Sequence, residues 1–350
     1  MRLLVEYSHP AQVHKFKHVF AELVRSGHQV LVLSRDKDVM IPLLDELKVP
    51  HICLSRARSG MFRLGLELIR REVLAFWYVC RFKPDVVFSA HSVAIAHVGW
   101  LLRKPVVVHD DTEFGNLQKM LYLPFANQIV TTTAYMQDLG RRQIRINSLE
   151  PLAYLHPKYF SPDEKVLSKY GLLKSDTYAI VRFVAWNAAH DVGHAPPTKK
   201  EREHLLEGLF ELGVARVVFT DESQEELEVS AELITPEPSD LHDLMAFATI
   251  SVGDGITVAN EAAVLGIPTV LWNPLRGGHS VELEKFGLLE RVDSLELLLE
   301  VSARLIEDPT SLDRWAEKRR ALLQEKEDFT LRMGQILLEA GGLKAGDDDL

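Results

Sequence analysis

Short apolar runs alternate with helical patterns along the first half of the chain. The spacing of apolar positions predicts helices at 14–26 and 41–47 and strands at 3–7, 29–33, 51–54, 86–89, 106–109 and 129–132. Gly27 ends the first helix in the manner of a C-terminal glycine. Strands that alternate with helices at this spacing indicate a parallel sheet with helices on both faces.

The same alternation returns in the second half of the chain. It predicts helices at 201–212, 241–248 and 258–265 and strands at 178–184, 216–220, 250–253 and 269–272. Two prolines interrupt the pattern between the halves, at Pro157 and Pro162. We therefore expect an α/β protein with the following parts: a domain over 1–153, a linker over 154–176, a second domain over 177–310, a helix over 311–340 and a disordered tail over 341–350.

Composition agrees with two globular domains and narrows the class of partner. The chain has 350 residues, of which 47% are hydrophobic, so a sizeable buried core is expected. Its formal net charge of −10 argues against general nucleic-acid binding, which needs a positive field. A small phosphorylated ligand stays compatible with this charge, because a local cluster of amide donors can bind a phosphate.

The cysteines and the N-terminus indicate a cytoplasmic location. Cys53 and Cys80 lie in apolar stretches without CxxC spacing, so we expect two buried free thiols in a reducing compartment. The first apolar run is too short for a signal peptide. The sequence contains no run of 18 apolar residues, so it predicts no membrane span. We expect no cofactor.

The segment 56–83 combines large apolar side chains with several arginines. One interpretation is a core-facing helix with solvated arginines. The other is an amphipathic helix that makes peripheral contact with a membrane surface.

The strongest candidate for a binding site lies at 252–268. A strand runs through Gly253-Asp254-Gly255 into a helix that carries Thr257 and Glu261. The glycines permit unusual backbone geometry, and the free N–H groups of a helix N-terminus suit a phosphate. Glu261 follows at helical spacing, where a carboxylate can accept ribose hydroxyls. The alternative is an ordinary strand–turn–helix with a solvated glutamate.

This stretch resembles the nucleotide-binding signature of GT-B-type proteins, which include the N-acetylglucosaminyltransferase of peptidoglycan synthesis and the UDP-N-acetylglucosamine 2-epimerases. Nearly the whole chain resembles the uncharacterised DUF354 family. The segments that carry this second resemblance are 8–14, 109–113, 156–160, 181–191 and 253–268. It implies a GT-B-like fold with two facing Rossmann-like domains and parallel sheets, and it leaves the reaction open.

The loop after the first strand of the second half is rich in polar side chains. In GT-B folds the corresponding loop faces the phosphates and the base, which implies ligand contacts here. The candidates for such contacts are Arg182, Trp186, Asn187, His190 and Asp191. A metal bound by His190, Asp191 and His194, or a merely polar loop, are the alternatives.

Three histidines follow predicted strands of the first half. His9 and His14 lie in the first strand-to-helix loop and are candidates for sugar contact and for proton transfer, with helix capping or surface exposure as the alternative. His91 follows the strand at 86–89. The epimerases have a carboxylate two positions after the similar histidine, and the run His91-Ser92-Val93-Ala94 has none, which argues against an epimerase mechanism.

The segment 109–113 places three carboxylates close together at the end of a buried strand. Asp110, Asp111 and Glu113 are candidates for a general base, because such clusters are often functional. The epimerases have a related segment with an active-site glutamate, and Asp111 matches its offset from His109. The alternative is N-capping of a helix that starts near Glu113.

Together these features predict a GT-B-type enzyme that transfers a glycosyl group from a nucleoside-diphosphate sugar, with a UDP-sugar favoured. A nucleotide-sugar 2-epimerase-like enzyme and a non-catalytic nucleotide- or sugar-binding protein are the alternatives. We expect no nucleic-acid partner and no tightly bound metal. The sequence gives no oligomeric state.

Overall fold

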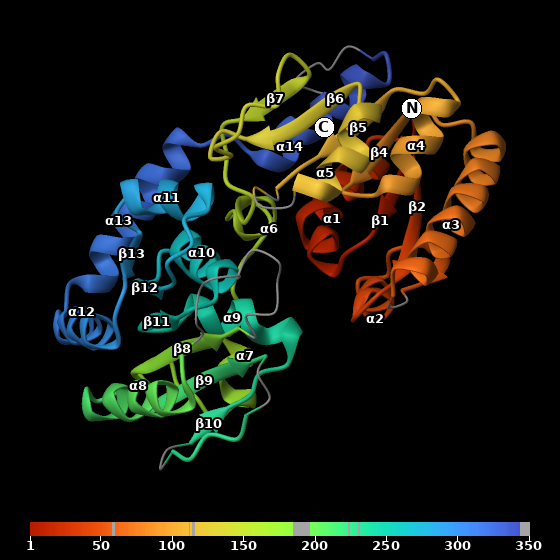
Figure 1. The fold of residues 1–350 in the computed structure, drawn as a ribbon. Coiled ribbons are helices and arrows are strands. Elements are labelled where there is room, and N and C mark those ends of the chain that lie inside the picture. Colours follow the sequence, from red (N-terminus) through yellow and green to blue (C-terminus); the bar gives the residue numbers. More distant parts are fainter. Residues whose placement is uncertain are drawn as a thin grey trace. The chain divides into compact units, whose positions relative to one another are not determined.

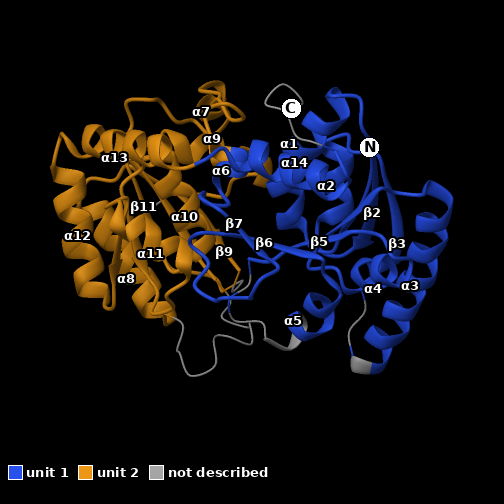
Figure 2. Ribbon diagram, turned by 90° about the horizontal axis from the view of Figure 1, so that it is seen from above, with its two compact units in different colours: residues 1–154, 327–350 blue, residues 155–326 orange. Residues whose placement is uncertain are grey.

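The computed structural model describes residues 1–57, 60–111, 113, 116–184, 197–222, 225–229 and 232–343. The chain divides into two compact units, which are coloured separately in Figure 2. Unit 1 comprises 1–154 and 327–350, and unit 2 comprises 155–326. The C-terminal segment therefore returns to the unit in which the chain begins.

Unit 1 contains a seven-stranded parallel sheet (Figure 1) in the order β3-β2-β1-β4-β5-β6-β7. The strands are β1 (Arg2–Tyr7), β2 (Gln29–Asp36), β3 (His51–Arg56), β4 (Val86–Ala90), β5 (Val106–His109), β6 (Gln128–Thr132) and β7 (Gln143–Ile146). The helices are α1 (Pro10–Arg25), α2 (Met40–Glu46), α3 (Met61–Phe82), α4 (Val93–Leu101), α5 (Asn116–Tyr122), α6 (Leu152–Leu155) and α14 (Phe329–Ala340), with the 3-10 turn η1 (Leu123–Phe125).

Alternating strand residues bury the two faces of this sheet against different helices. On one face, Val87 of β4 packs in a cluster with Ala75 and Val79 of α3. On the other face, the next residue, Phe88, packs its ring against Phe16 of α1 at a centroid distance of 4.8 Å. This period-two pattern explains why both faces of the strands are apolar, as is typical of a parallel sheet.

Unit 2 contains a six-stranded parallel sheet in the order β10-β9-β8-β11-β12-β13. The strands are β8 (Tyr178–Phe183), β9 (Arg216–Asp221), β10 (Leu233–Ile234), β11 (Ile250–Gly253), β12 (Thr269–Trp272) and β13 (Leu289–Val292). The helices are α7 (Lys165–Lys169), α8 (Lys199–Glu211), α9 (Leu241–Ala246), α10 (Ile256–Leu265), α11 (Gly278–Lys285), α12 (Leu295–Glu307) and α13 (Ser311–Glu325), with the 3-10 turn η2 (Pro238–Asp240).

Each sheet has a point at which the order of its strands reverses. In unit 1 it lies between β1 and β4, and in unit 2 between β8 and β11. Ligands of open α/β sheets bind outside the carboxyl ends of the strands at such points. The loops after these four strands are therefore the first places to look for a site.

Three expectations from the sequence need correction. The single helix expected over 311–340 is two helices, because Asp328 caps a new helix by accepting a hydrogen bond from the N–H of Leu331 at 3.1 Å. Cys53 and Cys80 are both exposed, not buried. The segment 56–83 was interpreted as a helix with its apolar side in the core and its arginines in solvent. In the structure, Phe62 and Ile69 of α3 are exposed and Arg71 is buried.

Candidate functional site

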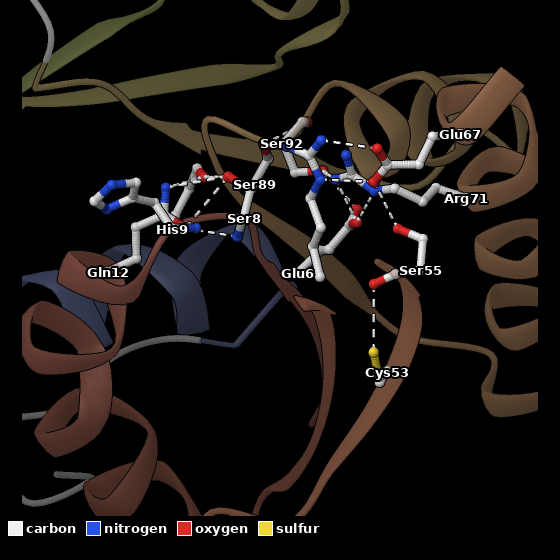
Figure 3. Close-up of polar contacts among 12 residues, drawn as sticks. Glu6, Ser8, His9, Gln12, Cys53, Ser55, Glu67, Arg71, Ser89 and Ser92 are labelled. Atoms are coloured by element: carbon white, nitrogen blue, oxygen red, sulfur yellow. Dashed lines mark hydrogen bonds and ion pairs between the residues drawn. The ribbon is translucent and has the colours of Figure 1, made fainter. Parts of the chain in front are cut away.

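The loop after β1 is tied to the end of β4 by Gln12 (Figure 3). Its side-chain oxygen accepts hydrogen bonds from the backbone N–H groups of Ser8 and His9, and its amide donates to the carbonyl of Ala90 at 2.6 Å. His9 is the N-cap of α1, and its Nδ1 accepts from the N–H of Ala11 at 3.3 Å. Burial, with a smaller contribution from Lys37, lowers the pKa of His9, so the imidazole is favoured in its neutral form.

His91, directly after β4, adopts a left-handed backbone conformation with φ of 58°. Its Nε2 lies 3.0 Å from a carboxylate oxygen of Asp111 and 3.2 Å from the backbone N of the same residue. A neutral Nε2 can accept the N–H, and a protonated Nε2 can donate to the carboxylate. Both protonation states of His91 therefore have a partner in Asp111, which suits a residue that transfers protons.

Lys15 of α1 connects this pair to a second histidine. Its ammonium forms ion pairs with Asp111 and, at 2.5 Å, with Glu150. The other oxygen of Glu150 lies 3.4 Å from Nε2 of His109, the last residue of β5. Burial lowers the pKa of His109, although Glu150 opposes this shift. We call His91, Asp111, Lys15, Glu150 and His109 the unit 1 cluster.

A carboxylate oxygen of Asp110 also lies 3.5 Å from Nε2 of His91, but the other partners of Asp110 and those of Glu113 differ from the partners of Asp111. Asp110 is fully buried and accepts a hydrogen bond from the hydroxyl of Tyr135 at 3.1 Å, and Lys119 donates to that hydroxyl at 2.7 Å. A side-chain oxygen of Glu113 accepts the N–H of Met136 at 2.8 Å. Burial raises the pKa of Tyr135 above its usual value and lowers that of Lys119. These contacts fix the chain between β5 and the end of β6.

Asp110 and Asp111 do not cap the next helix. Helix α5 begins at Asn116 rather than near Glu113, so Asp110 and Asp111 lie too far away to cap it. Thr112 lies outside the described residues. His14 lies beside Lys15 on α1, with its ring 6.0 Å from that of Tyr154.

Three members of the unit 1 cluster have the side-chain types that bind metals. Among the described residues, His91, His109 and Asp111 form a group whose ligand atoms lie within 4.8 Å of one another. Imidazole nitrogen and carboxylate oxygen are ligands of zinc and similar ions. The ammonium of Lys15 already pairs with the same carboxylate, so positive charge is present at Asp111 without an ion.

In unit 2 the two glycines of the signature are required by the close approach of β8. Gly253 has φ of 139°, and a Cβ on it would lie 2.2 Å from the carbonyl oxygen of Arg182. A Cβ on Gly255 would lie 2.5 Å from Cγ of Arg182. The glycines therefore let the end of β11 and the start of α10 pack directly against Arg182, whose guanidinium pairs with Glu222.

Asp254, between these glycines, is fully buried and binds the backbone. A carboxylate oxygen accepts the N–H of Val184 at 2.9 Å, and its carbonyl accepts from the side chain of Asn273 at 2.8 Å. Asp254 thus fixes the ends of β8, β11 and β12 to one another. Its contacts are those of a residue that shapes the turn.

Glu261 lies in the second turn of α10 and is mostly buried. One of its carboxylate oxygens lies 3.2 Å from Nε2 of His242 in α9. Thr257, one turn earlier, is exposed. Trp186, Asn187, His190 and Asp191 were also expected to contact a ligand, but they lie outside the described residues.

Sequence reasoning missed Lys15 and Glu150 of the unit 1 cluster, and it missed a buried polar network beside it (Figure 3). In that network the hydroxyl of Ser92 donates to Glu6, and Arg71 donates to both of these side chains. One signal was visible in the sequence, because Glu6 interrupts the apolar run at 3–7.

Comparisons with known proteins agree with this architecture. The model of the family described as "Protein of unknown function (DUF354)" matches residues 2–332. An uncharacterized protein of Methanocaldococcus jannaschii is 26% identical over 328 residues, which cover 88% of this chain and 95% of the relative.

Solved structures give the same result for the fold. The UDP-GlcNAc 2-epimerase of Neisseria meningitidis bound to UDP-GlcNAc is similar with a TM-score of 0.71, at 13% identity, over 97% of this chain and 99% of that chain. The glycosyltransferase SsfS6 of Streptomyces sp. SF2575 is similar with a TM-score of 0.59, at 15% identity, over 96% of this chain and 100% of that chain. The fold is therefore α/β of the GT-B type, as the sequence predicted.

Proposed function

The chain belongs to the DUF354 family of proteins of unknown function, and from that premise we propose that it is a GT-B-type enzyme acting on a nucleoside-diphosphate sugar. Glu261 of unit 2 is the group that we propose to bind the nucleotide, and the unit 1 cluster contains the acid–base groups. The reaction that we favour is transfer of the glycosyl group to an acceptor hydroxyl.

The observation that carries this proposal is the position of Glu261. It lies in the second turn of α10, directly after the strand-order reversal between β8 and β11. The first turn of a helix offers backbone N–H groups and a positive dipole end, which favour a phosphate. A carboxylate one turn further along the helix is at a suitable distance to accept the two hydroxyls of a ribose. His242 at 3.2 Å gives that carboxylate a fixed orientation.

The unit 1 cluster supplies the chemistry that glycosyl transfer needs. Asp111, which lies 3.0 Å from His91, or His91 itself can accept the proton of an acceptor hydroxyl, because a carboxylate and a neutral imidazole are both bases. Lys15 balances the charge of Asp111 and Glu150. Positioning and electrostatic stabilisation of the departing diphosphate supply the rest, without a covalent intermediate.

A second candidate is a 2-epimerase-like reaction, which the His91–Asp111 pair favours. The sequence argued against this reaction, because none of the three residues directly after His91 carries a carboxylate. In the folded protein Asp111 comes to His91 from the next strand along the sheet. Similarity to a UDP-GlcNAc 2-epimerase supports the same candidate.

Ligand screening followed by turnover assays tests the proposal. A nucleoside-diphosphate sugar that binds the native protein should raise its melting temperature. With the best ligand, glycosyl transfer releases free nucleoside diphosphate when an acceptor is added, detected by ³¹P NMR. Epimerisation in D₂O instead incorporates deuterium at the carbon that inverts. Binding without either product would make the protein a nucleotide-sugar binder, and the absence of any stabilising nucleotide sugar would refute the proposal.

A further inference from the structure

Helix α3 presents large apolar side chains to solvent along its whole length. The exposed fractions of Phe62 and Val73 are 79% and 64%. Apart from Leu64, the exposed apolar residues of α3 recur at intervals of three and four, so they form one continuous stripe. We call this stripe the α3 apolar face, and its members are Phe62, Leu66, Ile69, Val73, Phe76 and Trp77.

Buried polar contacts fix the opposite side of α3 to strands β1, β2 and β3 of the unit 1 sheet (Figure 3). Arg71 binds Glu6 of β1, and Glu67 accepts hydrogen bonds from Arg35 of β2 and Ser55 of β3. Ala75 and Val79 continue this side into the core. The helix cannot rotate its apolar face inward without breaking these contacts. The exposure of that face is therefore built into the fold.

The exposed charged side chains of α3 are all positive. Arg63, Arg70 and Arg81 are exposed and share one edge of the helix, at intervals of 7 and 11 residues. Of the two acidic residues of α3, Glu67 is buried against Arg35, and Glu72 is half-buried and contacts His97. A row of arginines on a chain of net charge −10 marks this edge as a local site for an anionic partner.

We propose that the α3 apolar face is a peripheral docking surface for an anionic lipid bilayer. A helix of 22 residues is about 33 Å long, so it can lie in the headgroup region with its aromatic side chains inserted and its arginines on lipid phosphates. In the described part of the chain, no helix is long and apolar enough to span a membrane.

The charge pattern disfavours a second copy of the chain as the occupant. Antiparallel pairing of two α3 helices about a two-fold axis would place both arginine rows along the same edge of the interface. Like charges there oppose association, whereas anionic headgroups neutralise them. The docking proposal does not depend on the proposed reaction, because it concerns a different surface and its test needs no substrate.

Vesicle flotation of the full chain tests the docking surface. The protein should float with phosphatidylcholine vesicles that contain about 30% phosphatidylglycerol, and binding should weaken as salt rises. The double substitution Ile69→Ser with Val73→Ser should reduce binding about tenfold or more. Arg70→Gln should reduce it about fivefold on anionic vesicles only. Leu173→Ser and Arg320→Gln, at exposed positions of unit 2, are matched controls that should bind as the wild type does.

A label on Cys80 gives a second readout. Cys80 is exposed near the end of α3, and Cys53 is exposed on β3. An environment-sensitive fluorophore on Cys80 of a Cys53→Ser variant should become brighter and blue-shifted with anionic vesicles. The same fluorophore on Cys53 of a Cys80→Ser variant should respond less. Wild-type protein that does not bind anionic vesicles would overturn the proposal. So would a wild-type dimer that Ile69→Asp converts to monomer, because a second copy would then cover the face.

Discussion

The guanidinium of Arg71 in α3 donates two hydrogen bonds to one carboxylate oxygen of Glu6 in β1, from Nε at 2.8 Å and from Nη2 at 2.5 Å. Both side chains are buried. The hydroxyl of Ser92 donates to the other oxygen of Glu6. Because Ser92 follows His91, this pair also braces the left-handed turn from which His91 reaches Asp111.

Loss of one partner of this pair should destabilise the protein strongly. Arg71→Met leaves the carboxylate of Glu6 buried without its cation and should lower the free energy of unfolding by roughly 3–5 kcal/mol. Urea denaturation measures this change. Arg70→Met, one position along the helix but exposed, is the control and should change stability little. The double variant Glu6→Met with Arg71→Met should recover much of the loss, and a double variant worse than Arg71→Met would contradict the argument.

The strands and helices could be predicted from the sequence because each buries a regular apolar pattern. The pair of Glu6 and Arg71 could not, because the two residues lie 65 positions apart and only the folded sheet joins them. The same holds for Lys15, whose partners are Asp111 and Glu150. Ion pairs between distant residues leave no periodic signal in the sequence. Gly253 and Glu261 could be predicted because they lie in one continuous strand–turn–helix segment.

The glycine of the unit 2 turn should tolerate no side chain. Gly253→Ala combines φ of 139° with a Cβ placed 2.2 Å from the carbonyl oxygen of Arg182. We expect a loss of roughly 3 kcal/mol or more in unfolding free energy, since the strained conformation alone costs about 1–3 kcal/mol. Gly277→Ala is a matched control in the same unit, because a Cβ there meets no atom within 4 Å. Equal melting temperatures for the two variants would show that the close approach is not rigid.

Glu261 should affect binding more than stability. Glu261→Gln preserves the shape of the side chain and removes the charge that is proposed to accept the ribose hydroxyls, so nucleotide affinity should fall at least about tenfold. Isothermal titration calorimetry with the ligand found by thermal shift measures the change. Glu307→Gln, exposed at the end of α12, is the control. Unchanged affinity in Glu261→Gln would remove this residue from the site.

Mild acid should destabilise unit 1 through His18. Burial first, then Lys17 and Arg25, lowers the pKa of His18 from 6.5 to about 4, with Asp328 opposing. The unfolded chain takes up this proton near the ordinary pKa and the folded chain does not. The stability is therefore fully present above pH 6.5 and is lost as the pH falls towards 4.

His18→Gln should flatten part of this dependence. Between about pH 7 and about pH 4.5 the wild type should lose roughly 2 kcal/mol more unfolding free energy than the variant. His9 and His109, whose pKa values burial also lowers, stay in both proteins and contribute equally. His204→Gln, at an exposed position of α8, is the control. If the curves of His18→Gln and the wild type run parallel, the role given to burial at His18 is wrong.

The three acids of the 109–113 segment should separate into one catalytic group and two structural ones. Asp111 contacts His91 and Lys15, so Asp111→Asn should lower turnover about 100-fold, the usual scale for acid–base catalysis, while nucleotide affinity stays near normal. Asp110 lies farther from Nε2 of His91, at 3.5 Å against 3.0 Å for Asp111, and binds Tyr135 in the core, while Glu113 binds the N–H of Met136. Asp110→Asn and Glu113→Gln should therefore lower the melting temperature and leave the turnover of the folded fraction largely intact. A pH–rate profile of Asp111→Asn that has lost one limb would place the proton transfer at this pair. Full activity of Asp111→Asn would instead move the general base to His14 or to His91 acting alone.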